Sequence, residues 1–441
     1  MSEVNTSEVE SPITTLISSW PRLAKPEAIS VFRALSADDA EEVFLAIGPR
    51  LQADLMELFN RAERRLWIRF LPPDDTVDLL QNLEEQLKAE ILELIDTKVR
   101  REIAALLSYR EDEAGGLMSP RFVRVRSDML VAEALRYVRQ QAQSVEPIHY
   151  IYVLDNEQRL KGVLSLRQLF VANAERRISD VMEEKVVWVP EEMDQEQVSL
   201  IFSQHRYVAL PVLDEGGRMR GVVTVDDILD VSEEEATEDI QKLGGQEALD
   251  APYPQVGLKD MVKKRAGWLT ILFVGQMLTA TAMSFFEDQI AKAWVLVLFI
   301  PLIISSGGNA GSQAATLIIR ALALRELRLS DWARVFWREV ATSLALGGLL
   351  AGVGFLRIIL WPNREIVYTE HFVLVGAAVA ASLVGVVVFG SVAGAMLPFL
   401  LRRFGLDPAS ASAPFVATLV DVTGLVIYFS VAKSMLAGSL L

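Results

Sequence analysis

The sequence has no cysteine and only three histidines among its 441 residues. Without cysteine the chain can form neither a disulfide nor a thiolate metal site. Three histidines, His149, His205 and His371, are too few for a cluster that would hold zinc or copper. The opening MSEVNTSEVESP lacks the basic and apolar runs of a secretory signal peptide, so residues 1–20 are predicted to be a disordered lead-in.

Basic residues are outnumbered in the first 260 positions. The whole chain carries a formal charge of −15, yet residues 261–441 hold 14 Lys and Arg against 9 Asp and Glu. This leaves a net charge of −20 on residues 1–260. Such a surface repels nucleic acid and anionic lipid heads but attracts cations, so no nucleic-acid partner is expected.

Charged residues are also rare over long stretches of the C-terminal part. About 20 apolar residues cross a bilayer core of about 30 Å, and five stretches qualify: 267–286, 293–319, 335–360, 371–401 and 412–437. They predict a five-helix transmembrane domain over 266–441. Lys and Arg concentrate before the first span and after the second and fourth, which predicts a cytoplasmic N-terminus and an outward-facing C-terminus.

The acidic part contains a repeat of about 60 residues. HYIYVLDNEQRLKGVLSLRQL (149–169) and RYVALPVLDEGGRMRGVVTVDDI (206–228) share an apolar strand, an acidic turn, a second strand and a helix start. Residues 117–230 thus resemble a tandem α+β pair of CBS domains. The resemblance implies an adenine nucleotide such as ATP bound by Thr224 and Asp227 of the second copy, whereas the first copy has Gln168 in place of the aspartate. Alternatively, Asp227 only caps a helix.

Upstream, residues 21–116 show helical patterns only, which predicts an all-α domain. LSADDAEEVF (35–44) and LPPDDTVDLL (71–80) echo one another, as in stacked helical hairpins that form a superhelix. In the other interpretation, Asp38 and Asp74 simply favour the dipole of a helix N-terminus.

A dense acidic segment joins the repeat to the spans. Residues 226–250 carry ten acids and one cation, Lys242, and 231–265 is predicted to be an acidic connector with a connecting helix. Hard divalent cations prefer carboxylate oxygens, so a cation sensor is one interpretation. A solvated helix face is the other.

Two features inside the spans are unusual for lipid-facing helices. PLIISSGGNAGSQAATLIIRAL (301–322) is predicted to interrupt the second span at Pro301 and at the glycine pair, and to line a pore through Gly307, Gly308, Asn309 and Gln313. A packing seam of small residues is the alternative. Asp421 is the one charged residue of 413–432, and an intramembrane carboxylate is expected to face a pathway or a partner. In the alternative interpretation, the Asp421 carboxylate forms a structural ion pair with Arg320, Arg338 or Arg357.

Four segments give the chain a resemblance to the MgtE family of magnesium channels: EATEDIQKLG (235–244), GGNAGSQAATLIIRALALREL (307–327), GAMLPFLLRRFGLDPA (394–409) and ATLVDVTGLVIYFS (417–430). The resemblance implies a homodimer in the bacterial inner membrane with its pore on the two-fold axis. Asp421 would select hydrated Mg²⁺ together with the carbonyl of Ala417. Cytosolic Mg²⁺ would close the pore by binding at the positions that match the family's gate, namely Asp74, Asp78, Asp214, Asp226, Glu247 and Asp250.

Three departures and two alternatives accompany this resemblance. Gly216 replaces an acid common in relatives, Lys259 lies in a connector poorer in carboxylates, and Ala413 replaces a polar residue. The first two put the strength of gating in question.

A secondary transporter of Co²⁺ and Mn²⁺ with nucleotide regulation remains the alternative function, although no inverted repeat is seen. No nucleophile elbow, dinucleotide fingerprint or hydrolase motif occurs, so the chain is not expected to be an enzyme.

Overall fold

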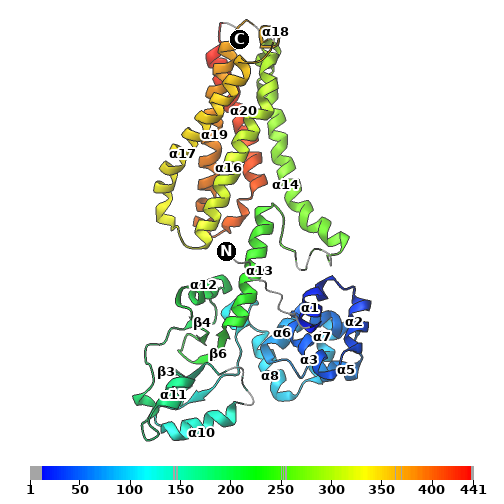
Figure 1. Cartoon of the computed structure of the whole chain (residues 1–441), viewed down its shortest axis with the longest axis vertical. Coiled ribbons are helices and arrows are strands. Elements are labelled where there is room, and N and C mark those ends of the chain that lie inside the picture. Colours follow the sequence, from blue (N-terminus) through cyan, green and yellow to red (C-terminus); the bar gives the residue numbers. More distant parts are fainter. Residues whose placement is uncertain are drawn as a thin grey trace, which may run out of the picture. The chain divides into compact units, whose positions relative to one another are not determined.

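The structure is a computed structural model that describes residues 12–142, 145, 148–249, 251, 253, 256–362, 364–368 and 370–438. The chain divides into two compact units, Met1–Glu235 and Ala236–Leu441. The first unit holds a helical region and two small sheets, and the second holds the long apolar helices (Figure 1).

The first unit begins with short stacked helices. Their bounds are α1 Pro12–Ser19, η1 Trp20–Arg22, α2 Lys25–Ala34, α3 Ala37–Ala46, α4 Pro49–Leu58, α5 Arg61–Trp67, α6 Pro73–Gln81, α7 Glu85–Leu94, α8 Thr97–Leu106 and α9 Ala114–Leu117. Most of them pack on the helix two positions further along the chain, as α2 does on α4, α4 on α6 and α6 on α8. This is the predicted superhelix.

The predicted lead-in over residues 1–20 is wrong from Pro12 on. Residues 1–11 lie outside the described residues, but α1 is helical because Ile13, Leu16 and Ile17 pack against the buried core of this region. Asp38 and Asp74 both lie in first turns, of α3 and α6, where a carboxylate favours the helix dipole.

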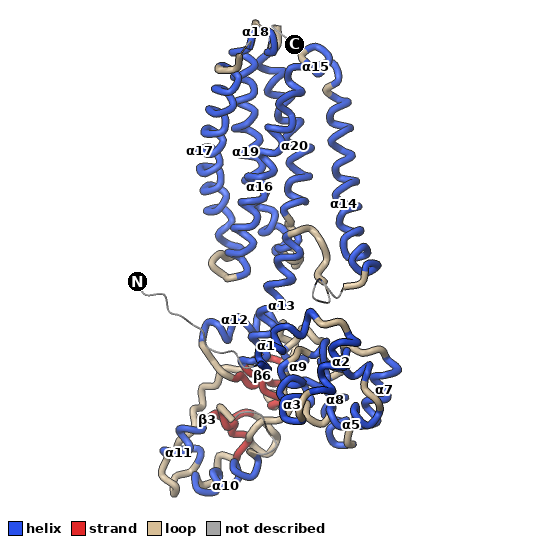
Figure 2. The backbone as a smooth tube through the Cα atoms, turned by 45° about the vertical axis from the view of Figure 1, so that its right-hand side comes forward, coloured by secondary structure: helices blue, strands red, loops and turns tan. Residues whose placement is uncertain are grey.

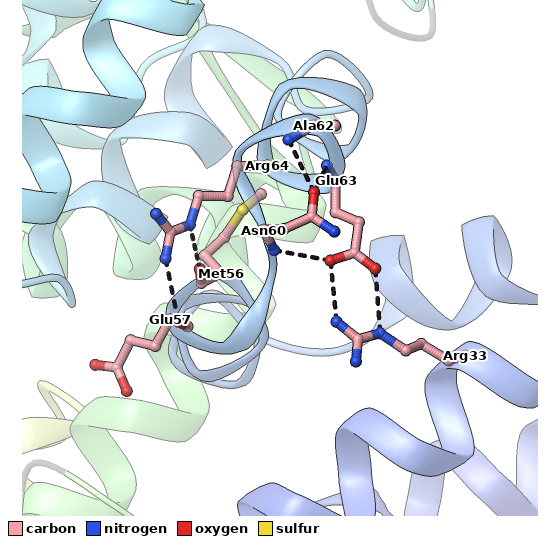
Figure 3. A network of polar contacts seen from close by, with 7 residues as sticks. All are labelled: Arg33, Met56, Glu57, Asn60, Ala62, Glu63 and Arg64. Carbon is pink, nitrogen blue, oxygen red and sulfur yellow. Dashed lines mark hydrogen bonds and ion pairs between the residues drawn. The ribbon is translucent and has the colours of Figure 1, made fainter.

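Polar contacts secure the joints between these helices (Figure 3). Asn60 caps α5 by accepting from the amides of Ala62 and Glu63, and the Glu63 carboxylate accepts in turn from the Asn60 amide. The two carboxylate oxygens of Glu63 form a bidentate ion pair with the guanidinium of Arg33 of α2, with N–O distances of 3.0–3.1 Å. Arg64 donates to two carbonyls at the end of α4. Helix ends that would otherwise leave backbone groups unpaired are therefore satisfied.

The repeat forms two three-stranded sheets of identical order. The strands are β1 Arg124–Val125, β2 Tyr150–Leu154 and β3 Leu160–Ser165 in one sheet, and β4 Val189–Pro190, β5 Ala209–Leu213 and β6 Met219–Thr224 in the other. In each, a parallel pair is followed by an antiparallel pair. The helices are α10 Val131–Gln141, α11 Leu166–Val171, η2 Ile178–Asp180, α12 Gln195–His205 and α13 Val225–Leu243 (Figure 2, where strands are red). The predicted α+β pair is confirmed.

The opening segment of each repeat crosses to the sheet of the other repeat. Ser119 bridges Val222 of the second sheet, and Glu183 bridges Val163 of the first. Met118 and Met182 lie over Gly221 and Gly162, where an added Cβ would meet the methionine side chains at 2.7–2.8 Å. Glycine at these two strand positions therefore permits the close approach that joins the repeats.

Among the described residues, the second unit contains five helices long and apolar enough to cross a membrane. Its elements are α14 Leu258–Phe285, α15 Glu287–Lys292, η4 Trp294–Phe299, α16 Ile300–Ala323, η5 Leu329–Asp331, α17 Trp332–Ile359, α18 Arg364–Tyr368, α19 Phe372–Arg403, η6 Pro408–Ser410 and α20 Ala413–Leu436. α16, α19 and α20 pack on one another, α17 packs on α19, and α14 lies at one side with its main contact to α20 (Figure 1).

The prediction that the glycine pair breaks the second span is wrong. Pro301 lies in the first turn of α16, where proline is tolerated, and the helix continues through Gly307 and Gly308 to Ala323. The reason is a seam in which α16 and α19 approach too closely for any side chain. A Cβ on Gly390 would lie 2.3 Å from the carbonyl oxygen of Gly307, and one on Gly394 would lie 2.1 Å from that of Gly311.

Candidate functional site

Asp421 lies near the middle of α20 and is half-buried. α20 begins at Ala413 behind the Ser412 cap, whose Oγ accepts from the amide of Phe415, with Pro414 in the first turn. Among the described residues no Lys or Arg forms an ion pair with Asp421, so the structure provides no salt-bridge partner for it. A side-chain amide does lie beside it, that of Gln276 of α14.

Arg357, one of the arginines proposed as ion-pair partners of Asp421, makes its contacts with other side chains. The guanidinium of Arg357 stacks over the Trp361 ring, 3.7 Å from its centroid, and donates to the Tyr368 hydroxyl at 3.4 Å. Asp421 is thus a carboxylate among apolar helices with an amide beside it. This arrangement suits a position that a cation passes.

Ala417 lies one turn before Asp421 and faces the glycine pair of α16. A Cβ on Gly308 would lie 3.5 Å from the Cβ of Ala417, which is ordinary contact. Because Ala417 lies inside α20, its carbonyl is part of the helical hydrogen-bond ladder. A carbonyl oxygen has a second lone pair, which is what it could offer to the water shell of an ion.

The four predicted pore-lining residues fall into two groups. Gly307 is buried against α19, where its Cβ would meet Val386 at 2.5 Å, so it belongs to the packing seam. Gly308 faces α20, and Asn309 and Gln313 are exposed on α16. Ser312, between them, donates to the carbonyl of Ala413 at 3.2 Å and so ties α16 to the first turn of α20.

The connecting helix ends in an ion-pair group that sequence reasoning missed. Lys242 of α13 binds Asp407 Oδ2 at 2.7 Å, in the loop before α20, and also Glu238. Burial alone would lower the pKa of Lys242, but these hydrogen bonds and charges outweigh it and raise the pKa above its ordinary value. The ammonium is therefore charged and holds the end of α13 to the loop that precedes Asp421's helix.

The segment after α13 packs on α14 and on the first turn of α20. Gly245 has a φ of 73°, which favours glycine, and a Cβ there would meet Trp268 at 2.8 Å and Pro414 at 3.1 Å. Trp268 of α14 donates its indole N–H to Ser412 Oγ at 3.2 Å. Glu247 is exposed while its amide donates to the Lys264 carbonyl.

In the first unit, acids gather around Asp78 of α6. Burial raises the pKa of Asp78 to about 8, with further contributions from the charges of Asp75, Asp227, Glu111 and Glu234. Asp74, one turn earlier, is 6% exposed. The sequence predicted Asp74 and Asp78, but it did not place Asp75 of the same helix, or Glu111 and Glu234 of distant segments, beside them. A carboxyl held neutral by burial and by surrounding acids is a position where a divalent cation would relieve repulsion.

The other predicted gate residues are not in this group. Asp214 accepts from the amides of Gly216 and Arg218, both at 2.8 Å, and pairs with Arg220 at 3.0 Å. The backbone hydrogen bond from Arg218 is the first cause that lowers the pKa of Asp214. Asp226 is exposed, and Asp250 lies outside the described residues.

The predicted nucleotide residues form a helix cap. Thr224 Oγ1 donates to Asp227 Oδ2 at 2.6 Å, and the Thr224 amide donates to the same oxygen at 3.2 Å. Ser165 and Gln168 form the matching cap in the first repeat.

In no part of the chain that the structure describes do three or more His, Cys, Asp or Glu converge closely enough to hold a metal ion. Those residues therefore do not form a site that coordinates a dehydrated metal ion directly. A hydrated Mg²⁺ needs only one or two carboxylates, because it keeps most of its water ligands.

Comparisons with known proteins agree along the chain. Residues 300–431 match the MgtE family model, described as a divalent cation transporter, residues 12–112 match the MgtE intracellular N domain, and 114–175 and 178–234 match CBS domains. The chain is 43% identical to the magnesium transporter MgtE of Thermus thermophilus over 96% of this chain and 92% of that one. It is 34% identical to MgtE of Enterococcus faecalis over 75% and 71%. A solved cytosolic domain of the Mg²⁺ channel MgtE in complex with ATP is 40% identical and covers 50% of this chain and 90% of that one, with a TM-score of 0.47.

Proposed function

The chain belongs to the MgtE family of divalent cation transporters, and from this premise we propose that it is a magnesium channel. It admits Mg²⁺ to the cytoplasm and is closed by Mg²⁺ bound to its cytoplasmic part. The observation that carries the proposal is Asp421, a carboxylate in the middle of an apolar span, for which the described residues provide no cationic partner. A carboxylate at such a depth is expensive unless a cation or water reaches it.

The pore is proposed to form between two copies of the chain. In a homodimer two Asp421 carboxylates would face one another across the axis, and the Ala417 carbonyls would lie one helical turn away. Mg²⁺ dehydrates reluctantly, so the ring binds the ion through its waters. Gly308 keeps this part of α16 free of side-chain bulk beside Ala417, and Asn309 and Gln313 offer further polar groups.

The orientation is proposed from the charged ends of the spans. Arg320 lies in the last turn of α16, Arg325 follows that helix, and Arg402 and Arg403 lie in the last turn of α19. The excess of cations on that side supports a cytoplasmic location for this end of the bundle, in a bacterial inner membrane. The acidic first unit then lies in the cytoplasm and the C-terminus outside.

The gate is proposed to use the acids around Asp78. A Mg²⁺ ion there would neutralise charges that otherwise repel one another, and its binding would release the proton that Asp78 holds at neutral pH. Asp74, Asp226, Glu247 and Asp250 remain proposed as further ligands. Asp214 is a weaker candidate, since its oxygens already bind the turn and Arg220.

The conformational change that closes the pore is proposed to be transmitted through the end of α13, the connecting helix. Lys242 holds Asp407 before α20, and Trp268 holds Ser412 at the α20 cap. A displacement of residues 236–249 would therefore pull on the first turn of the helix that carries Asp421. These contacts support a mechanical route from connector to pore.

An adenine nucleotide such as ATP is proposed as a second regulatory ligand, at Thr224 and Asp227. To bind it, the Thr224 hydroxyl would have to exchange its contact with Asp227 for one to the ligand. Because Asp227 also contributes to the charge around Asp78, nucleotide and Mg²⁺ would influence one another's binding.

The proposal is tested by Mg²⁺ flux into proteoliposomes that hold the full chain. Asp421→Asn removes the charge while it keeps the size, and should strongly reduce flux. Thr423→Val is the matched control, because the Thr423 hydroxyl only donates to the Leu419 carbonyl of its own helix. Parental flux and selectivity in Asp421→Asn would remove Asp421 from the pathway and with it the proposed pore.

A further inference from the structure

The side chain of Gln276 distinguishes α14 from an ordinary lipid-facing helix. Between residues 266 and 286 α14 has no charged residue, and its other polar side chains are the Trp268 indole and four hydroxyls. The hydroxyl of Thr279 is buried without a hydrogen bond. Thr270, Thr281 and Ser284 each donate to the carbonyl four residues earlier and are satisfied within the helix. Gln276 instead reaches the Asp421 carboxylate of α20.

α14 and α20 are held close at this level. A Cβ on Gly275 would lie 3.0 Å from Cγ2 of Thr418, so the two helices approach one residue before Gln276 and one turn before Asp421. The glycine leaves the amide within reach of the carboxylate. Hydrogen bonds between membrane helices are made where the alternative is an unsatisfied polar group in hydrocarbon.

Resting on the proposed pore, we infer that Gln276 is a positioning and selectivity residue for the ion that passes Asp421. In this role its amide N–H would donate to one carboxylate oxygen and fix the orientation of the carboxylate. The amide oxygen and the second carboxylate oxygen then remain as two neighbouring acceptors. The waters of a hydrated Mg²⁺ direct their hydrogens outward, so they can donate to both acceptors.

This pair favours an ion that keeps its water shell. Mg²⁺ holds its waters in strict octahedral geometry, whereas Ca²⁺ accepts variable coordination and takes protein oxygens directly. Fixed acceptors spaced for a hydrated ion therefore discriminate between the two. A carboxylate free to rotate would adapt to either ion.

The test measures the permeability ratio of Mg²⁺ to Ca²⁺ from reversal potentials of the full chain in planar bilayers. Gln276→Met keeps the length of the side chain without its amide and should lower the ratio by about threefold, the effect of an average hydrogen bond between membrane helices. Thr281→Val on the same helix is the control and should leave the ratio at the parent's value. The ratio does not depend on how much protein inserts, so a loss of folded protein alone would not change it.

A double-mutant cycle separates this inference from the proposed pore. Gln276→Met should have a smaller effect in an Asp421→Asn background, because the two side chains act together. If Asp421→Asn changes the ratio and Gln276→Met does not, or if the two effects simply add, Gln276 has no such role while the pore stands. If Asp421→Asn also leaves the ratio unchanged, the pore assignment fails. Should Gln276→Met not assemble, Gln276→Asn, whose amide is one methylene short, must lower the ratio, and a parental ratio overturns the inference.

Discussion

Replacement of Asp78 by Asn should stabilise the chain without Mg²⁺ and weaken its response to Mg²⁺. In the folded state burial and neighbouring acids raise the pKa of Asp78 from 3.8 to about 8. Below about pH 4 the carboxyl is neutral in folded and unfolded chains alike, so it has no effect on stability. As pH rises toward 8 the unfolded chain releases the proton first, and stability falls. Above pH 8 the loss is complete.

The size of the effect follows from the shift. One pKa unit corresponds to about 1.4 kcal/mol, so at pH 7 the protonated Asp78 lowers the free energy of unfolding by at most about 4 kcal/mol. Relaxation of the surrounding acids and access of water reduce this value. Asp78→Asn should therefore raise the melting temperature in EDTA by a few degrees at pH 8 and by less at pH 5.

The assay is thermal unfolding of the full chain in detergent, followed by tryptophan fluorescence with and without Mg²⁺. Parent protein should gain stability from Mg²⁺, and Asp78→Asn should lose much of that gain, because a cation bound there no longer neutralises a carboxylate. Glu42→Gln is the matched control, since Glu42 occupies the corresponding position of α3 and is exposed. A variant that melts lower than the parent in EDTA, or that keeps the full Mg²⁺ gain, would refute this reasoning.

Three further predictions address the membrane unit. Gly394→Val should abolish Mg²⁺ flux, because a Cβ there would lie 2.1 Å from a backbone oxygen of α16, while Gly348→Val, with open space around it, should conduct normally. Lys242→Met should leave the channel open at Mg²⁺ concentrations that close the parent. Adding Asp407→Asn should raise the inhibitory Mg²⁺ concentration little further, because both substitutions break the same ion pair. Additive effects on that concentration would argue against the link. Gly308→Ala should conduct, since its Cβ would lie 3.5 Å from Ala417, but Gly308→Val should not, and equal flux in both would show that this contact does not limit the pore.

The sequence predicted the features whose signals are local. The five spans follow from long apolar runs, and the tandem repeat follows from two matching strand and helix patterns. Asp421 could be singled out because one carboxylate in an apolar span is unusual wherever it is packed. The sheets' shared register then confirmed the repeat at the level of single pairs, Tyr150 with Ser165 and Ala209 with Thr224.

Features that depend on distant contacts could not be predicted in this way. Glycine is a poor helix former, so a break at Gly308 was a reasonable prediction, but the seam that keeps α16 helical needs Gly390 and Gly394 of another span. Gln276 lies far from Asp421 in the sequence and gives no local signal of its role. The acids around Asp78 likewise come from α6, from α13 and from Glu111, just before α9. Each of these became visible only when the packing was known.

The central claim is tested most directly by single-channel recording of the purified full chain in a planar bilayer, with Mg²⁺ as the only permeant cation. Magnesium is raised on the side of the N-terminal unit while the current is followed. The account predicts discrete Mg²⁺ openings whose probability falls as this Mg²⁺ rises, and a strongly reduced Mg²⁺ current through the openings of Asp421→Asn. Openings whose probability is independent of Mg²⁺ would contradict the proposed gate, and parental Mg²⁺ currents in Asp421→Asn would contradict the pore.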